Sequence, residues 1–260
     1  MDARPIALVA AAALLAVLGC LWWRALTVAA QLRQRLETAA MELQRLQISF
    51  ARFAPEEVVE RIAASGVPTA AENKEVTILF ADLVSFTHLS EQLAPDVLVK
   101  ILNEYFARMS RVIAEHRGHV SKFIGDGLLA LFGALDANPW QANDALHAAL
   151  AMRAELEAYN EVLSTRGLPR LAFGVGVHRG TAVAGIIGSN DLMEFTVIGN
   201  TVNIASRIEH LTREHGADIL ITDAVRQTLD PRFVLYELPA VAIRGISQPM
   251  VTFAVRGFGA

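Results

Sequence analysis

The hydrophobic and polar positions divide the chain into three parts, and the first is an apolar run. Residues 6–23 contain no charged side chain, and Arg4 and Arg24 flank them. As a helix, this run would extend about 27 Å, close to the thickness of a bilayer's hydrocarbon core. The pattern therefore predicts one transmembrane helix, and Trp22 and Trp23 at its end suit the membrane interface.

A secretory signal peptide is the alternative, because the alanines of the run offer cleavage points. The preceding segment is nearly neutral, however, with Asp2 opposing Arg4, and a helical pattern continues directly out of the run. We therefore expect a retained anchor within residues 1–24. Three arginines follow closely: Arg24, Arg33 and Arg35. The positive-inside bias then places the rest of a single-pass protein in the cytoplasm, at the inner or plasma membrane.

The second part, residues 25–69, begins with a heptad pattern. Seven apolar residues recur at alternating spacings of four and three: Leu32, Leu36, Ala39, Leu43, Leu46, Phe50 and Phe53. This stripe predicts a short parallel coiled coil that holds two chains together. The alternative is an amphipathic helix packed on the following domain, although such helices usually show a wider apolar face. A short helix at residues 55–62 and a linker complete this part.

The third part, residues 70–260, alternates strand and helix patterns. Period-two or short apolar runs predict strands at 75–81, 119–124, 128–132, 171–178, 182–187, 194–198, 219–221, 233–237, 241–244 and 251–255. Longer patterns predict helices at 95–116, 138–164, 199–215 and 222–229. Arg179 and Gly180 are expected to form a hairpin turn between two of the strands. The order predicts an α+β sandwich of the ferredoxin-like kind.

Composition narrows the class of protein. The chain has 260 residues, of which 53% are hydrophobic, so it is a folded protein. Its formal net charge of −4 argues against a general nucleic-acid binder. Cys20 is the single cysteine, which excludes an intrachain disulfide.

Two carboxylates stand at strand ends. Asp126 lies between two glycines in the predicted hairpin turn, and Asp82 follows the predicted strand 75–81. Mg²⁺ takes oxygen ligands, typically one or two carboxylates with substrate phosphates and waters. Two such aspartates, with the backbone carbonyl of Leu83 beside them, suit this role. Taken singly, each aspartate is also compatible with ordinary turn or cap chemistry.

A polar pair lies near the start of the helix predicted at 199–215. Asn203 and Arg207 are four residues apart, so both side chains project from one face. A helix N-terminus attracts phosphate, and arginine adds a planar donor fork. Without other signals, an ordinary polar surface of an amphipathic helix is the better explanation of this pair.

Three segments together resemble the signatures of one family. They are residues 80–87 (FADLVSFT), 122–127 (KFIGDG) and 199–207 (GNTVNIASR). In this order they are similar to the motifs of class III adenylate and guanylate cyclases, and the resemblance covers about residues 70–256. It implies a ferredoxin-like class III cyclase catalytic domain, here preceded by one transmembrane helix and a short coiled coil.

The resemblance implies a role for each motif residue. Asp82 and Asp126 match the family's two metal-binding aspartates, and Leu83 adds its carbonyl oxygen. Each site would hold two divalent cations, Mg²⁺ or Mn²⁺. Asn203 matches the residue that orients the ribose, and Arg207 matches the arginine that stabilises the α-phosphate in the transition state.

Substrate choice also follows from the resemblance. Lys122 and Thr196 match the two positions that read the purine, where adenylate cyclases carry Lys with Asp or Thr and guanylate cyclases carry Glu and Cys. The pair therefore indicates ATP. Arg244 stands where the family usually has a lysine for the terminal phosphates. The implied enzyme is an adenylate cyclase, a phosphorus-oxygen lyase of intracellular signal transduction that makes 3′,5′-cyclic AMP and pyrophosphate.

The family builds its sites at a dimer interface, so this chain resembles the homodimers with two active sites. The coiled coil would set how the two catalytic domains pair. Thr196 also resembles the subgroup that includes bicarbonate-responsive cyclases. The alternatives are a guanylate cyclase and a catalytically silent nucleotide-binding regulator. A diguanylate cyclase or polymerase-type palm domain shares the layout, but the Gly-Gly-acid-acid-Phe turn of the diguanylate cyclases is missing.

Overall fold

The computed structural model describes residues 22–24, 28, 31–42, 71–189, 193–242 and 249–259. The chain divides into two compact units, Met1–Phe53 and Ala54–Ala260.

In the first unit, residues 31–42 are helical. They carry the first heptad positions, and the side chains of Leu32 and Leu36 are 57% and 66% exposed. The later heptad positions lie outside the described residues, so the coiled coil stays a prediction. The same holds for the short helix at 55–62 and for nearly all of the apolar run 6–23. None of the helices that the structure describes combines the length and apolar character needed to cross a membrane.

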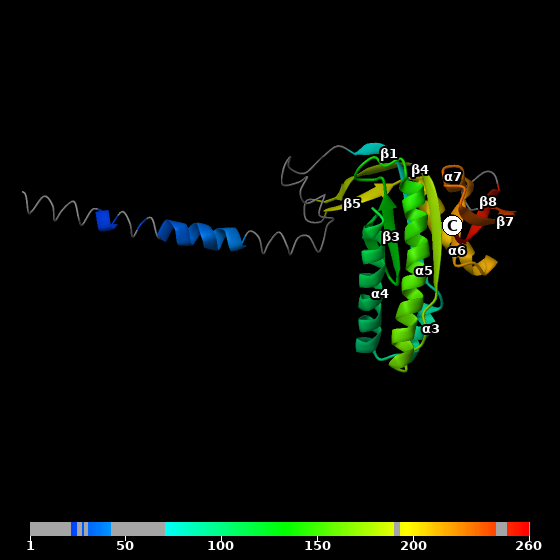
Figure 1. Cartoon of the computed structure of the whole chain (residues 1–260), viewed down its shortest axis with the longest axis horizontal. Coiled ribbons are helices and arrows are strands. Elements are labelled where there is room, and N and C mark those ends of the chain that lie inside the picture. The colour runs from blue at the N-terminus through cyan, green and yellow to red at the C-terminus, as the bar shows by residue number, and fades with distance from the viewer. Residues whose placement is uncertain are drawn as a thin grey trace, which may run out of the picture. The chain divides into compact units, whose positions relative to one another are not determined.

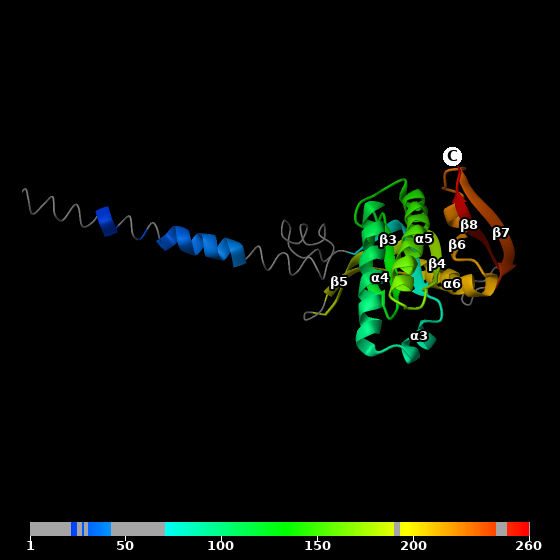
Figure 2. The same ribbon diagram turned by 60° about the horizontal axis from the view of Figure 1, so that its bottom comes forward.

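The second unit contains one mixed sheet with helices packed on it (Figures 1 and 2). Its strands are β1 (Glu72–Leu83), β2 (His119–Ile124), β3 (Gly127–Phe132), β4 (Phe173–Gly188), β5 (Met193–Ile198), β6 (Ile219–Thr222), β7 (Phe233–Val241) and β8 (Met250–Phe258). Its helices are α3 (Phe86–Gln92), α4 (Pro95–Glu115), α5 (Gln141–Thr165), α6 (Asn200–His215) and α7 (Asp223–Arg226).

The first half of this unit has ferredoxin-like topology, as the sequence pattern predicts. The strand order is β2-β3-β1-β4-β6-β8-β7, and β5 pairs with β4 outside that path. The strands β1 to β4 pair antiparallel with one another in the order β2-β3-β1-β4. Helices α3 and α4 connect β1 to β2, and α5 connects β3 to β4. This is the βαββαβ arrangement.

The central strand β1 is buried on both faces because its apolar side chains alternate between two clusters. Leu79, Ala81 and Leu83 belong to the main core, where they meet α4 and α5. Val76 and Ile78 face the opposite side, under β5 and the start of α6. Figure 1 shows α4 and α5 side by side over the sheet. A strand buried on both faces fixes its own register, since a slip by one residue exchanges the two faces.

The hairpin predicted at Arg179 and Gly180 is wrong. The structure has one continuous strand there, β4, and these two residues pair with Thr77 and Val76 of β1. At position 180, the lack of a side chain allows α6 to pack closely against β4. A Cβ atom on Gly180 would lie 3.1 Å from Thr201 Oγ1 at the start of α6. The Arg-Gly pair therefore marks where a helix approaches the strand.

Other elements are confirmed with shifted ends. Helix α5 begins at Gln141 instead of at Asn138, whose side-chain oxygen accepts a hydrogen bond from the Trp140 amide at 2.9 Å. Helix α3, at Phe86–Gln92, is an element that the sequence patterns do not predict. The predicted strands 233–237 and 241–244 correspond to the single strand β7 as far as Val241. Arg244 lies outside the described residues.

Candidate active site

The two predicted metal aspartates lie together at one end of β1. Asp82 pairs with Gly174 of β4, and the preceding Ala81 pairs with Leu128 of β3. This register places the β2–β3 turn, and with it Asp126, beside Asp82. A Cβ atom on Gly127 would lie only 2.9 Å from Asp82 Oδ1. Because Gly127 has no side chain, the space beside the Asp82 carboxylate stays open.

The charges at this end of the sheet repel one another. Burial raises the pKa of the Asp126 carboxyl above its usual value, and the nearby charge of Asp82 raises it further. The turn itself is formed through Gly125, whose φ of +63° suits glycine. A carboxyl group whose ionisation is disfavoured by a neighbouring carboxylate makes a favourable place for a cation.

A cationic side chain already contacts these donors. Arg213, in the last turn of α6, donates from Nη2 to Asp82 Oδ2 at 2.6 Å, and the same nitrogen lies 3.5 Å from the Leu83 carbonyl oxygen. Its Nη1 donates to Glu209 Oε1 at 2.9 Å. Neither Glu209 nor Arg213 is among the site residues predicted from the sequence. The only local signal was the Glu-to-Arg spacing of four on one helix, which is typical of an ion pair.

The donor set fits a hard divalent cation. Two carboxylates and a backbone carbonyl are oxygen ligands of the kind that Mg²⁺ and Mn²⁺ prefer. Across the described ranges, no three His, Cys, Asp or Glu side chains form a potential metal-binding group. Two carboxylates and one carbonyl are part of a coordination sphere, which suits a metal whose other ligands are substrate phosphates and water.

The strands that carry the two predicted purine-reading residues, Lys122 and Thr196, contact each other. Ser121, next to Lys122, donates from Oγ to the Phe195 carbonyl at 3.2 Å and lies 3.4 Å from Thr196 Oγ1. The Lys122 ammonium pairs with the Glu194 carboxylate. Strands β2 and β5 thus meet, although more than seventy residues separate them in sequence. Thr196 is 5% exposed, while the Lys122 side chain is 32% exposed.

Asn203 and Arg207 lie in the first half of α6, with Asn203 exposed and Arg207 half-buried. Thr201 anchors this end of the helix by donating to the Thr181 carbonyl at 2.6 Å. Asn203 precedes Arg213 by ten residues, which corresponds to about 15 Å along the helix axis. The start of α6 and the aspartates beside its end are thus separate parts of the site.

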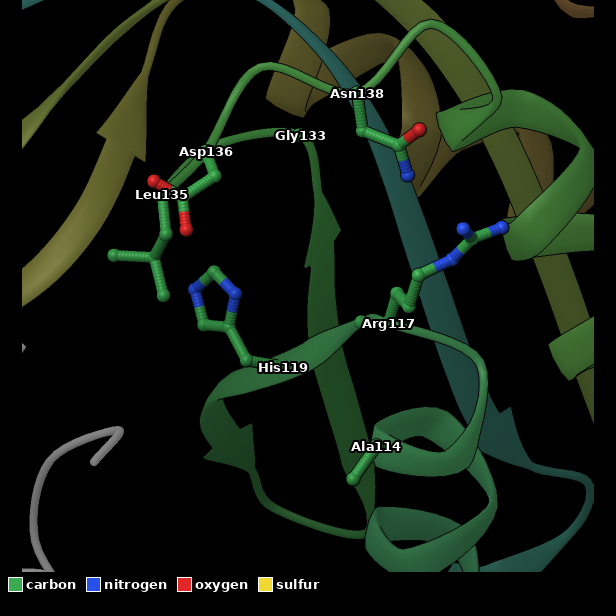
Figure 3. Close-up of a pocket in the computed structure, with 8 residues that line it drawn as sticks. Ala114, Arg117, His119, Gly133, Leu135, Asp136 and Asn138 are labelled. Atoms are coloured by element: carbon green, nitrogen blue, oxygen red, sulfur yellow. The ribbon is translucent and has the colours of Figure 1, made fainter. Parts of the chain in front are cut away.

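A cavity of about 420 Å³ lies elsewhere, at the end of α4 and beside the loop after β3 (Figure 3). Figure 3 shows His119 and Asp136 on one side of it and Arg117 on the other. The Arg117 side chain is bound to Asp144 Oδ1 at 2.5 Å. The lining includes none of the predicted site residues. This cavity is therefore distinct from the candidate active site.

The fold and the paired aspartates define a class of nucleotide-processing domain, and comparison with known proteins identifies the family. Residues 69–257 match the adenylate and guanylate cyclase catalytic domain. The chain belongs to this family.

Two relatives are named adenylate cyclases. The chain is 40% identical over 202 residues to adenylate cyclase of Anabaena cylindrica, which covers 75% of this chain and 39% of that protein. It is 38% identical over 179 residues to adenylate cyclase 1 of Rhizobium meliloti, which covers 68% of this chain and 27% of that protein. The chain thus spans well under half the length of these relatives.

Solved structures of both cyclase types share the fold. The guanylyl cyclase Cya2 is 33% identical with a TM-score of 0.69, over 74% of this chain and 96% of that one. The adenylyl cyclase CyaB from P. aeruginosa is 27% identical with a TM-score of 0.68, over 72% and 96%. The fold alone therefore does not choose between ATP and GTP.

Proposed function

We propose that this protein is an adenylate cyclase that converts ATP to 3′,5′-cyclic AMP and pyrophosphate. The observation that carries the proposal is that Asp126, in the β2–β3 turn, lies beside Asp82 at the end of β1. The two carboxylates provide oxygen donors for divalent cations within a domain of the cyclase family. The relatives named adenylate cyclase support the choice of reaction.

In this mechanism the ribose 3′-hydroxyl loses its proton to solvent and its oxygen forms a bond to the α-phosphorus. The bond from that phosphorus to the oxygen bridging to the β-phosphate breaks, and pyrophosphate leaves with that oxygen. Asp82, Asp126 and the Leu83 carbonyl would hold the cations. When bound, the cations lower the pKa of the 3′-hydroxyl and neutralise charge on the triphosphate. Asn203 orients the ribose, and Arg207 stabilises the negative charge on the α-phosphate. Arg244 is proposed to bind the terminal phosphates.

The choice of ATP depends on Lys122 and Thr196. The lysine donates to adenine N1, and the threonine hydroxyl accepts from the exocyclic amine. Their proximity through Ser121 supports a shared purine pocket, and the Lys122–Glu194 pair restricts where the ammonium group points. A guanylate cyclase is the alternative, and it would need different side chains at these two positions.

The active enzyme is proposed to be a homodimer with two sites. The purine-reading pair and the start of α6 would face the metal aspartates of the second chain. Exposed apolar side chains beside the purine-reading residues support an interface there. Phe123 and Ile124 are each 50% exposed, and Ile198 is 53% exposed. The predicted coiled coil over residues 32–53 would hold the two chains in register.

We further propose that the apolar run 6–23 anchors the protein in the inner or plasma membrane with the catalytic domain in the cytoplasm. Fractionation of cells should then place the full chain with the membranes, and recovery in the soluble fraction would exclude the anchor. Thr196 motivates a second proposal, sensitivity to bicarbonate. A flat bicarbonate titration of activity would exclude that sensitivity.

The proposed reaction is tested with the purified full chain, supplied with ATP or GTP in Mg²⁺ or Mn²⁺. The expected result is cyclic AMP as the main product, at a rate that depends on the divalent cation. Cyclic GMP as the main product would reverse the proposed purine specificity. Nucleotide binding without a cyclic product in either metal would indicate a silent regulator instead.

A further inference from the structure

The end of α6 lies unusually close to the sheet because β4 has glycines beneath it. A Cβ atom on Gly174 would lie 2.2 Å from Thr212 Oγ1, and one on Gly176 would lie 2.2 Å from the Glu209 amide nitrogen. Any larger residue at these positions would push the helix away. This close packing buries Glu209, whose side chain is only 3% exposed.

A buried carboxylate is stable only with partners. Glu209 has two, since Oε1 accepts from Arg213 Nη1 at 2.9 Å and Oε2 lies 2.9 Å from His210 Nδ1. Burial raises the pKa of Glu209, while the charge of Arg213 opposes that rise. The helix packing therefore fixes the Glu209 carboxylate, and Glu209 in turn fixes one end of the Arg213 guanidinium.

The other end of the guanidinium reaches the metal aspartate. Nη2 of Arg213 donates to Oδ2 of Asp82 at 2.6 Å. The second oxygen of the same carboxylate, Oδ1, faces Gly127 in the hairpin that carries Asp126. The two oxygens of Asp82 thus have different surroundings: one is held by Arg213, and the other lies next to Gly127, the residue after Asp126.

We propose that Arg213, anchored by Glu209, is a positioning residue that orients the Asp82 carboxylate toward the divalent cation. This inference rests on the proposed metal role of Asp82. Carboxylates that ligate metals are commonly held by a second hydrogen bond, and loss of such a partner costs roughly tenfold to a hundredfold in metal affinity or activity. The fork geometry of arginine suits the task because its two amino groups bind two carboxylates at once.

The arrangement also links the two proposed sites of the dimer, because one chain would contribute its aspartates to one site and its Asn203 and Arg207 to the other. Asn203 and Arg207 lie on the same helix whose last turn holds Asp82. The Glu209–Arg213 pair therefore ties the position of α6 to the orientation of a metal ligand within one chain.

An opposite effect of Arg213 is conceivable on charge alone. A guanidinium near a divalent cation repels it, so simple removal of the positive charge would strengthen metal binding. Orientation predicts that removal of Arg213 weakens the affinity for the divalent cation, and repulsion predicts that it strengthens that affinity. The direction of the change in affinity therefore decides between them.

The test measures Mn²⁺ binding to the full chain without nucleotide, by the loss of the free-ion electron paramagnetic resonance signal. Arg213→Ala should weaken Mn²⁺ binding roughly tenfold to a hundredfold. Arg213→Lys, which keeps one donor and the charge, should restore part of the affinity. Unchanged or tighter binding by Arg213→Ala would overturn the proposal.

Three further variants complete the test. Glu209→Gln keeps Arg213 but weakens its anchor, so it should also lower the affinity, and it serves if Arg213→Ala fails to fold. Arg111→Ala removes an arginine from an exposed pair with Glu115 at the same helical spacing, and it should bind Mn²⁺ like the wild type. Asp82→Asn should abolish binding at this site. If it does not, the metal role of Asp82 fails, whereas normal binding by Arg213→Ala alone overturns only the positioning role.

Discussion

The candidate site has a metal half, formed by the proposed metal ligands Asp82 and Asp126, and a purine half, formed by Lys122 and Thr196. The two halves are built differently. Asp82 lies on β1, which pairs with neighbours on both sides and is buried on both faces. Thr196 lies on β5, which pairs only with β4 among the described strands. The proposed metal chemistry is thus carried by a strand that is paired on both sides, and the proposed substrate choice is carried by a peripheral one. This difference suits a family that contains enzymes for two purines.

The largest effect is expected when the metal half loses a carboxylate. Asp82→Asn or Asp126→Asn removes a charged oxygen donor, so turnover of ATP should fall on the order of a hundredfold to a thousandfold. Steady-state production of cyclic AMP measures this. Asp96→Asn, at an exposed position in the first turn of α4, is the matched control and should keep its activity. Comparable loss in that control would show that the effect is not specific to the site.

The stability of the sheet should also depend on pH, because a histidine is buried in β4. His178 of β4 is 7% exposed, and its Nδ1 lies 2.8 Å from Thr222 Oγ1. Burial lowers its pKa from 6.5 to about 4, with the charge of Glu75 opposing the change. The unfolded chain therefore binds this proton more readily than the folded chain. The contribution of the neutral histidine to stability is complete above pH 6.5, and it is lost as the pH falls to about 4.

The size of this loss is on the order of 3 kcal/mol, from 1.36 kcal/mol for each pKa unit. Chemical denaturation across that pH range measures it as a change in the free energy of unfolding. His178→Gln should remove this part of the dependence of the unfolding free energy on pH. His88→Gln, at an exposed position, should leave that dependence unchanged. An identical dependence in wild type and His178→Gln would contradict the assignment.

A smaller change tests the space beside Asp82. Gly127→Ala places a Cβ atom 2.9 Å from Asp82 Oδ1 and 3.0 Å from the Ala81 carbonyl oxygen. Overpacking of this kind costs about 1–3 kcal/mol of stability, and the displaced carboxylate should weaken metal binding. Thermal unfolding and Mn²⁺ titration report the two effects. Gly257→Ala has no heavy atom within 4 Å of the new Cβ and should be nearly neutral. Wild-type Mn²⁺ affinity in Gly127→Ala would show that the carboxylate tolerates the crowding.

The smallest effect on the protein itself is expected in the purine half. The double change Lys122→Glu with Thr196→Cys removes both proposed adenine contacts, so ATP turnover should fall about tenfold or more. The melting temperature should change little, since the Lys122 side chain is partly exposed and β5 is peripheral. Parallel assays with ATP and GTP measure the preference. An undiminished preference for ATP would refute the assignment of these two residues.

Sequence patterns predicted the elements whose signals are local. The apolar face of α4, the β2–β3 hairpin and the start of α6 could all be read from spacing and turn residues. The Arg179-Gly180 pair in β4 led to the wrong prediction of a hairpin turn. Glycine occurs both in tight turns and where a helix approaches a strand closely, and sequence alone does not separate the two cases. Arg213 was missed because its contact with Asp82 spans 131 positions in the chain. Only the folded sheet brings α6 over the end of β1.

The continuity of β4 has a mechanical consequence. Its 16 residues extend about 50 Å at the usual rise of a strand. One end pairs with β1 at Leu83, next to Asp82, and the other carries β5 with Thr196. The metal half and the purine half of each chain are therefore both attached to the same continuous strand. A force applied at the β5 end is resisted by bending a hydrogen-bonded strand, which is far stiffer than the loop that a hairpin would have placed between them.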